Sequence, residues 1–431
     1  MKSYRYYPEI KIRNARAKTF VRLSILAVFG LGFSLPAAAL DLQNILDSFG
    51  NPKIARRLNR DLNTVGRSLE PTQSLTAKRP EARCNKHCPF DGQYRITDLG
   101  SLGGTASFAY SINNHGTVVG LSRTQGDTET HPFVFLKNEM ADIFPKIETP
   151  EHINNFGQVV GNLTSGGLSI PAAYNLKIDR TKLLGTLGGA TASGSTGTAL
   201  DNNDNGQIVG YSYLDSINKH AFLYDRGTMR DIGSFGGYSN ATAINKQGAI
   251  VGFSSNTING RAHAFFFAEG KMKDISPVND PTFENSESYA RDVNNKGVIV
   301  GEFFTPDQKA FHAFIYKKGK LTTFNLKGSD LTVPFSINKH GKIVGIMDVP
   351  YNATCLDPEG KPVLCTQFKQ HAFLYRKGRI IDLNRLISNK INWELSWAFG
   401  INDKGQIVGY GVRDGNFRAF LLSPTSINDN N

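Results

Sequence analysis

The sequence predicts an all-β protein, a seven-bladed β-propeller made of four-stranded antiparallel blades. Three observations support this prediction. A turn phrase, Asn-x-x-Gly-x-x-Val-Gly, occurs seven times; a five-residue phrase of the HAFLY type follows each copy; and a short apolar strand, usually with an Asp, accompanies each unit. Units of about forty to fifty residues with four short strands each are typical of propeller blades.

The turn phrase marks the first hairpin of each unit. Its glycines recur at steps of 41 to 64 residues. Asn and Gly tolerate the left-handed backbone of a tight hairpin, so the segments before and after the phrase are expected to be strands. The repeated asparagines are Asn113, Asn154, Asn203, Asn245, Asn294, Asn338 and Asn402.

The HAFLY phrase supplies the third strand. It reads HAFLY at 220 and 371, HAFFF at 263, HAFIY at 312, HPFVF at 131, RAFLL at 418 and, most divergent, IPAAY at 170. Five units thus begin this strand with histidine: His131, His220, His263, His312 and His371. Repeated polar residues on propeller strands more often tie a blade to a neighbouring loop than form a metal-binding ring, so we predict a structural role and no metal or other cofactor.

The ends of the repeat array predict how the ring closes. An Asp strand at residue 96 stands before the first turn phrase, and the last unit stops at residue 424 without one. We therefore expect the N-terminal strand to complete the last blade, which leaves no open sheet edge.

The region before the propeller contains two features. Residues 1–39 resemble an export signal, with a basic stretch, an apolar run and three alanines at 37–39; an uncleaved membrane anchor is the alternative. Residues 40–92 form a spacer and linker, with an amphipathic basic helix expected over 52–69 that either docks as a spacer or rests on an anionic membrane surface. The predicted propeller spans 93–424, and 425–431 is a tail.

Charge and cysteine content limit the classes of function. The formal net charge of +12 falls to +6 without residues 1–39, and the propeller lacks a basic stripe with interleaved aromatics, so nucleic acid is a poor candidate partner. The four cysteines suggest two local disulfides, Cys84 with Cys88 and Cys355 with Cys365, although three pairings are possible. An oxidising compartment favours disulfides over a metal site at the first pair.

The repeat resembles the HAF-repeat family of predicted extracellular proteins. The HAFLY phrases, the INxxGxIVG phrase and the DLGxLGG tail carry this resemblance over about residues 94–424. The resemblance implies export and a propeller-like array. It implies no reaction and no catalytic residues.

Function is expected on the face that carries the loops of variable length, because binding residues concentrate on variable loops of a rigid scaffold. The longest are 346–370 and 384–398. We predict an exported binding or adhesion module for a glycan or cell-surface protein, in the periplasm, at the cell surface or outside the cell. Its candidate aromatic platforms are Trp393, Trp397, Tyr351, Tyr213 and Tyr238.

Two other classes of function remain open. A polysaccharide hydrolase or lyase would need paired carboxylates at the channel mouth, for which Glu284, Glu287 and Glu302 are the candidates. A structural envelope protein would be anchored through residues 40–92. We expect no catalytic residues and lean against an enzyme.

Overall fold

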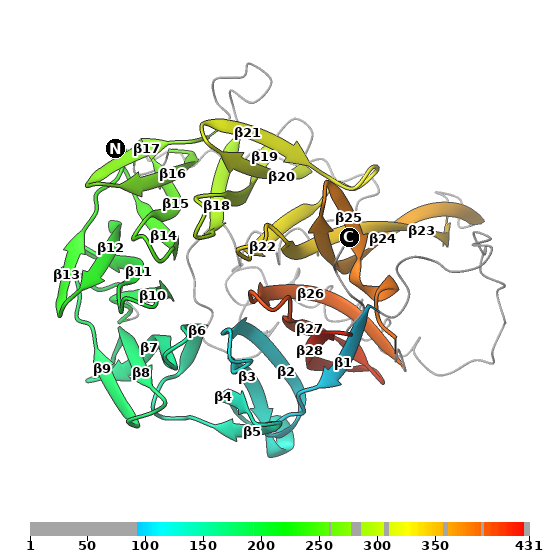
Figure 1. The fold of residues 1–431 in the computed structure, drawn as a ribbon, viewed down its shortest axis with the longest axis horizontal. Helices are drawn as coiled ribbons and strands as arrows, with labels where there is room; N and C mark the ends of the chain where they lie inside the picture. The colour runs from blue at the N-terminus through cyan, green and yellow to red at the C-terminus, as the bar shows by residue number, and fades with distance from the viewer. Residues whose placement is uncertain are drawn as a thin grey trace, which may run out of the picture. The chain divides into compact units, whose positions relative to one another are not determined.

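A computed structural model describes residues 93–192, 194–257, 260–276, 286–305, 310–356, 361–388 and 392–425. They belong to the compact unit Ala37–Asn431 and form seven four-stranded antiparallel sheets. Figure 1 shows the sheets arranged as blades around a centre. The predicted seven-bladed propeller is therefore confirmed.

Each of the first three blades follows the chain order. Blade 1 contains β2 (Gly103–Ile112), β3 (Val118–Thr124), β4 (Thr130–Leu136) and β5 (Glu139–Asp142). Blade 2 contains β6 (Thr149–Ile153), β7 (Gln158–Ser165), β8 (Leu168–Asn175) and β9 (Arg180–Leu183). Blade 3 contains β10 (Gly197–Asn202), β11 (Ile208–Tyr213), β12 (Lys219–Asp225) and β13 (Thr228–Asp231).

The remaining blades continue the series and then close it. Blade 4 contains β14 (Ser239–Ile244), β15 (Ile250–Ser255), β16 (Ala262–Ala268) and β17 (Lys271–Asp274). Blade 5 contains β18 (Glu287–Val293), β19 (Ile299–Thr305), β20 (Ala310–Lys317) and β21 (Lys320–Phe324). Blade 6 contains β22 (Thr332–Ile337), β23 (Ile343–Leu356), β24 (Pro362–Arg376) and β25 (Arg379–Asp382). Blade 7 contains β26 (Trp393–Ile401), β27 (Ile407–Arg413), β28 (Asn416–Pro424) and β1 (Tyr94–Asp98).

Strand β1 closes the ring as the sequence predicts. It pairs antiparallel with β28, from Tyr94 opposite Pro424 to Asp98 opposite Phe420. The first strand of the array therefore forms the outer edge of the last blade.

The strand order places two kinds of connection on two faces. In each blade the first strand is innermost, and its hairpin to the second strand lies on what we call the turn face (Figure 1). The hairpin between the third and fourth strands returns to the same face. The connections between second and third strands, and those between blades, lie on the opposite face, which we call the loop face.

Two glycines of each turn phrase have separate structural reasons. The first adopts a left-handed backbone, with φ between +69° and +86° in all seven copies, such as Gly116 and Gly297. The second, such as Gly210, lies so close to the first strand that a Cβ would meet a backbone carbonyl oxygen at 1.7 to 2.2 Å in every blade. Any side chain there would force the two strands apart.

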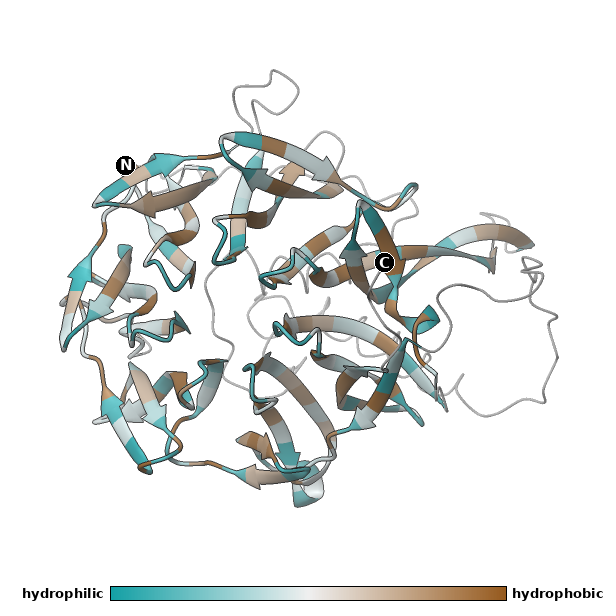
Figure 2. Cartoon of the chain, in the orientation of Figure 1, coloured by the Kyte–Doolittle hydropathy of each residue, from teal (hydrophilic) through white to brown (hydrophobic). Residues whose placement is uncertain are grey.

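The hydrophobic core lies between neighbouring blades. The phenylalanine of the HAFLY phrase is fully buried in six blades, as Phe222 and Phe373 illustrate. The fourth strands are mostly exposed and more hydrophilic, as Figure 2 shows on β9 and β13. Residues 1–92, with the predicted export signal, basic helix and Cys84–Cys88 pair, lie outside the described residues, as does most of the tail.

Candidate functional site

A closed ring of hydrogen bonds links the seven turn-phrase asparagines. The Nδ2 of each asparagine donates to the backbone carbonyl of the asparagine in the next blade, at 2.9 to 3.2 Å. The ring closes when Asn402 donates to Asn113. Each Oδ1 also accepts the backbone N–H groups two and four residues later in its own turn, as in Asn294. The asparagines are buried, so this ring fixes both the turns and the blade order.

A second ring at the following residue is incomplete. In five places a backbone N–H donates to a side-chain oxygen of the equivalent residue in the next blade, for example Asn155 to Asp204 and Lys339 to Asp403. The two missing bonds are those that the side chains of Lys246 and Lys339 would have to accept, and a lysine side chain has no hydrogen-bond acceptor. Those two cations and the carboxylates of Asp204 and Asp403 surround the channel mouth on the turn face.

A β-bulge in each first strand sets which side chains line the channel. The pairing with the second strand shifts by one residue just before the turn phrase in all seven blades, for example between Ala199 and Asp201. A bulge redirects the side chains around it. The channel mouth encloses about 180 Å³ and is lined mainly by polar groups.

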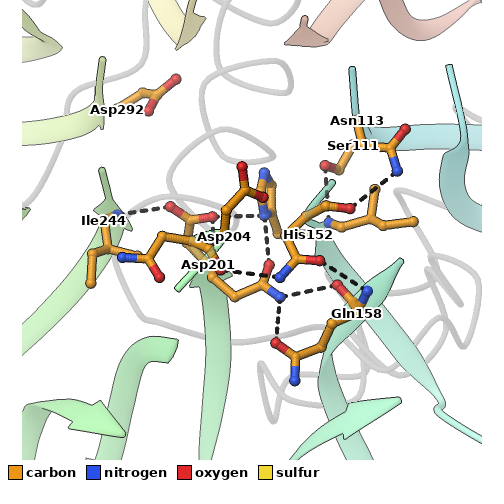
Figure 3. A network of polar contacts seen from close by, with 12 residues as sticks. Ser111, Asn113, His152, Gln158, Asp201, Asp204, Ile244 and Asp292 are labelled. Carbon is orange, nitrogen blue, oxygen red and sulfur yellow. Dashed lines mark hydrogen bonds and ion pairs between the residues drawn. The ribbon is translucent and has the colours of Figure 1, made fainter. Parts of the chain in front are cut away.

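A polar network occupies one side of this mouth (Figure 3). His152 Nδ1 lies 2.8 Å from Asp201 Oδ1 and 2.9 Å from Asn202 Oδ1. Asp201 Oδ2 accepts the backbone N–H of Ile244 in the next blade. Asp292 Oδ2 accepts that of Ile337 in the same way. The two aspartates thus each form a hydrogen bond to the backbone of the next blade.

The network shifts the protonation of its members. Burial alone would lower the pKa of His152, but the Asp201 carboxylate and the bond to Asn202 raise it to about 9. Burial raises the pKa of Asp292 to about 6, against the hydrogen bond from Ile337 and together with the charge of Asp201. Burial also raises the pKa of Glu151 to about 7. The side chain of His152 keeps 36% of its surface exposed at the channel mouth, so this imidazole remains accessible to solvent.

A cluster of aromatic rings joins blades 6, 7 and 1. Phe335 stacks on Trp397 at 5.6 Å between centroids, and Phe399 lies 5.2 Å from Phe335 and 5.5 Å from Tyr110. Tyr410 stacks on Trp397 at 5.9 Å. These rings come from β22, β26, β27 and β2, so the aromatic cluster spans the interfaces between three blades.

The structure gives no paired catalytic carboxylates among the described candidates. Glu302 is 1% exposed and forms an ion pair with Arg291 of its own blade. Burial raises its pKa and the Arg291 guanidinium opposes that shift. Glu287 accepts a hydrogen bond from the Tyr289 hydroxyl, and Glu284 lies outside the described residues. In a hydrolase that used these residues, the Glu302 carboxylate would already be engaged by the Arg291 guanidinium.

The repeated histidines connect strands within their blades. In four blades the histidine Nδ1 lies 2.6 to 2.9 Å from an aspartate on the fourth strand, as in His220 and Asp231. His312 contacts Asn325 instead. The other aspartate oxygen accepts a backbone N–H at the start of the connection to the next blade. In the described part of the chain, no group of three or more His, Cys, Asp or Glu side chains is placed to hold a metal ion.

The five predicted aromatic platforms do not form one surface. Trp393 is 5% exposed and packs in the core edge-on to Phe420, which corrects its assignment as a ligand platform. Trp397 belongs to the aromatic cluster of blades 6, 7 and 1. Tyr213 packs edge-on to Tyr211.

The other two tyrosines also have neighbours of their own. Tyr238 packs edge-on to Phe253 at 6.4 Å. Tyr351 donates its hydroxyl hydrogen bond to Gln367 on the neighbouring strand. Each of these two tyrosines therefore has its partner within its own blade. The aromatic cluster was not predicted from the sequence because its members come from three blades.

The prominent feature of the loop face is an extended hairpin in blade 6, which we call the arm. Strands β23 and β24 continue to pair from Asp348 with Gln370 out to Leu356 with Pro362, and Figure 1 shows them reaching past the other blades. A disulfide joins Cys355 to Cys365 near the tip, with 5.8 Å between their Cα atoms.

Comparisons with known proteins leave the activity of the chain open. A family model described as "Protein of unknown function (DUF3466)" matches residues 230–332, which contain blades 4 and 5. No curated protein sequence matches the chain. No helix among the described residues has the length and apolar character needed to cross a membrane.

Several solved structures are similar at low identity. TolB from Acinetobacter baumannii matches 71% of this chain and 80% of its own, with 15% identity and a TM-score of 0.35. A puromycin-hydrolyzing peptidase from Mycobacterium tuberculosis matches 78% of this chain and 55% of its own, with 9% identity and a TM-score of 0.44. Trypanosoma rangeli sialidase matches 78% of this chain and 58% of its own, with 9% identity and a TM-score of 0.32. The chain thus spans little more than half the length of the latter two. The fold assignment rests on the strand pairings described above.

Proposed function

We propose that the chain is an exported β-propeller that binds a protein partner at the cell surface through the arm of blade 6. The observation that carries the proposal is the arm itself. Second strands in the other blades have six to eight residues, whereas β23 has 14 and its partner β24 has 15. The additional length contributes nothing to ring closure, which the asparagine ring and β1 accomplish.

The base and the tip of the arm are both fixed. Trp397 Nε1 donates to Gln370 Oε1 at 3.2 Å, and Lys369 Nζ lies 3.2 Å from Glu394 of blade 7. The disulfide holds the tip. A rigid projection loses little conformational entropy when it binds, which favours recognition of a partner.

The surface of the arm suits a protein. Near the tip Leu364 is 78% exposed and Val363 40% exposed. Beyond the base, β23 and β24 pair with each other and no third strand is paired with them among the described residues, so both are edge strands there. An exposed apolar tip and open strand edges fit strand addition by another polypeptide better than they fit a sugar.

Two further points support the cellular setting. A disulfide is expected in an oxidising compartment outside the cytosol, which supports export to the periplasm or beyond. The repeated motifs support our proposal that the chain is a member of the HAF-repeat family.

The test compares matched variants of the mature chain. Leu364→Ser should weaken binding to intact cells by at least about fivefold, because a desolvated apolar anchor is lost. Ile217→Ser is the control, since Ile217 is 71% exposed on the loop face of blade 3 and has no role in the arm. A third variant joins Val349 to Lys369 through Asn-Gly and so removes the arm.

The readouts are binding to intact cells before and after mild surface proteolysis, and a glycan array. The proposal expects protease-sensitive binding that is lost with the arm. Unchanged binding by the armless chain, with its β-sheet circular dichroism retained, would contradict it. Saturable glycan binding that depends on the arm would replace the protein partner with a glycan.

A further inference from the structure

The interface between blades 2 and 3 contains a groove of about 730 Å³ that opens on the turn face. Its lining comes from β7, β8 and β9 of blade 2 and from two hairpins of blade 3, at Asn205–Gln207 and Tyr224–Gly227. The volume is within the range of small-ligand sites.

A single repeat position explains why the groove lies here. The residue after the HAFLY phenylalanine position points into the interface with the next blade and is a large apolar side chain in six blades: Val134, Leu223, Phe266, Ile315, Leu374 and Leu421. In blade 2 this residue is Ala173, at the same interface position and in the groove lining. The divergent phrase IPAAY therefore removes the side chain that would otherwise occupy this space.

The rim of the groove carries an excess of positive charge. Arg180 and Lys182 come from β9, and Arg226 from the hairpin between β12 and β13, all three exposed. Lys182 Nζ lies over the Tyr224 ring at 5.2 Å. One carboxylate, Asp225, also lines the groove. No described acid forms an ion pair with Arg180 or Arg226, so their charges are directed to solvent and to whatever enters the groove.

Amide groups add further donors. Gln158 and Gln207 use their side-chain oxygens to accept hydrogen bonds from Asn202 and Asn203, and Asn175 Oδ1 accepts from the backbone of Lys177. Their NH₂ groups donate to no described residue. The floor is apolar, with Ala173, Leu184 and Ile208 buried. The groove thus offers an apolar floor, cations at the rim and amide donors along its sides.

We propose that this groove binds an acidic oligosaccharide, a short chain of sugars that carry carboxylate groups. Carboxylates match the guanidinium and ammonium groups, hydroxyls match the amide donors, and the apolar face of a sugar ring matches the floor. This site lies on the face opposite the arm and does not depend on the function proposed for the arm.

The test measures binding of trigalacturonic acid to the purified mature chain by calorimetry, beside its uncharged trimethyl ester. We expect the acid to bind about tenfold or more tightly than the ester, and to weaken as salt rises. Ala173→Leu should fill the groove and weaken binding by about tenfold or more, with the fold kept, because Leu occupies this position in blades 3, 6 and 7.

A charge variant keeps the proposal testable if Ala173→Leu fails to fold. Arg226→Gln should weaken binding by about fivefold to tenfold, as expected for loss of a charge-assisted contact. The control is Arg230→Gln, since Arg230 occupies in blade 3 the strand position that Lys182 occupies in blade 2. Equal binding of acid and ester, or full binding by the folded Ala173→Leu and Arg226→Gln variants, would overturn the site. A triglutamate peptide that binds as tightly as the sugar would overturn the ligand class.

Discussion

The turn face of this propeller is nearly the same in every blade, whereas the loop face differs from blade to blade. On the turn face the same asparagine makes the same inter-blade hydrogen bond seven times, and the glycine behind it adopts the same backbone conformation. On the loop face each blade has a different connection, and one blade extends into the arm. The difference shows that the chain repeats what holds the ring closed and varies what is free to contact a partner.

Blade 2 keeps the asparagine ring while other repeat positions in the blade change. Its Asn154 forms the same bond to Asn203 as in the other blades. The histidine and aspartate of the outer strands are replaced there by Ile170 and Leu183, and the large apolar residue by Ala173. The groove is thus a local departure within an intact frame.

The largest effect is expected for a charge defect inside blade 5, at the buried ion pair between Arg291 and Glu302. Arg291→Met leaves Glu302 buried without its partner and should lower the free energy of unfolding by about 3 kcal/mol at pH 7. Burial raises the pKa of Glu302, so protonation at lower pH should relieve part of this loss. Urea denaturation at pH 7 and pH 5 measures it. The double variant Arg291→Met, Glu302→Gln should recover most of the loss, and a loss that persists in it would contradict the cause.

The asparagine ring comes next. Asn294→Ala removes one inter-blade bond and two turn bonds from a buried site, and should cost about 2 to 3 kcal/mol. Asn295→Ala is the matched control because its side chain accepts a single bond, from Lys246, and it should cost under about 1 kcal/mol. An equal loss of unfolding free energy in the two variants would contradict a larger contribution of the asparagine ring to stability.

A histidine–aspartate pair on the outer strands should have a smaller, pH-dependent effect. Asp231 raises the pKa of His220, and burial of Asp231 is outweighed by His220 and Gly233, which lower its pKa. The contribution is therefore present above the ordinary pKa of an aspartate and below that of a histidine. It is lost as the pH falls through the lowered aspartate pKa or rises through the raised histidine pKa.

His220→Ala should accordingly cost about 1 kcal/mol near pH 5.5 and less at pH 9. Thermal unfolding of the two proteins at both pH values checks this. The reverse trend, a larger loss at pH 9, would contradict the sign of the coupling.

The smallest effect on the ring is expected for the arm disulfide. The double variant Cys355→Ser, Cys365→Ser should leave the unfolding of the ring unchanged within about 0.5 kcal/mol. The disulfide joins two strands that pair with each other in the described part of the arm and does not join them to another blade. Residues of the arm should become more sensitive to proteolysis. A large drop in ring stability would show that the arm is part of the frame.

Much of the frame was predictable because the repeated residues act locally. Asn and Gly in the turn phrase report a hairpin wherever they occur, and the Asp strand at residue 96 was enough to predict closure by β1. The histidines and asparagines were also expected to be structural, but their partners lie on other strands or blades, and spacing alone does not reveal them.

The candidate sites were harder to predict because they depend on register and on neighbouring blades. Trp393 and Trp397 are four residues apart on β26 and would share a face on a regular strand. The pairing shifts between Leu395 and Trp397, so Trp393 enters the core and Trp397 stacks in the aromatic cluster with Phe335 and Tyr410. Ala173 was visible in the divergent phrase IPAAY, but the groove became apparent only when the same position was seen to fill the other six interfaces.

Hydrogen exchange measured along the whole chain tests the central claim most directly. The backbone N–H groups that donate to the ring asparagines, such as those of Gln158 and Val298, should exchange most slowly and at similar rates in all seven blades, blade 2 included. Loop-face connections and the arm should exchange faster and at rates that differ between blades. Fast or widely differing exchange at the seven turns would contradict a uniform frame.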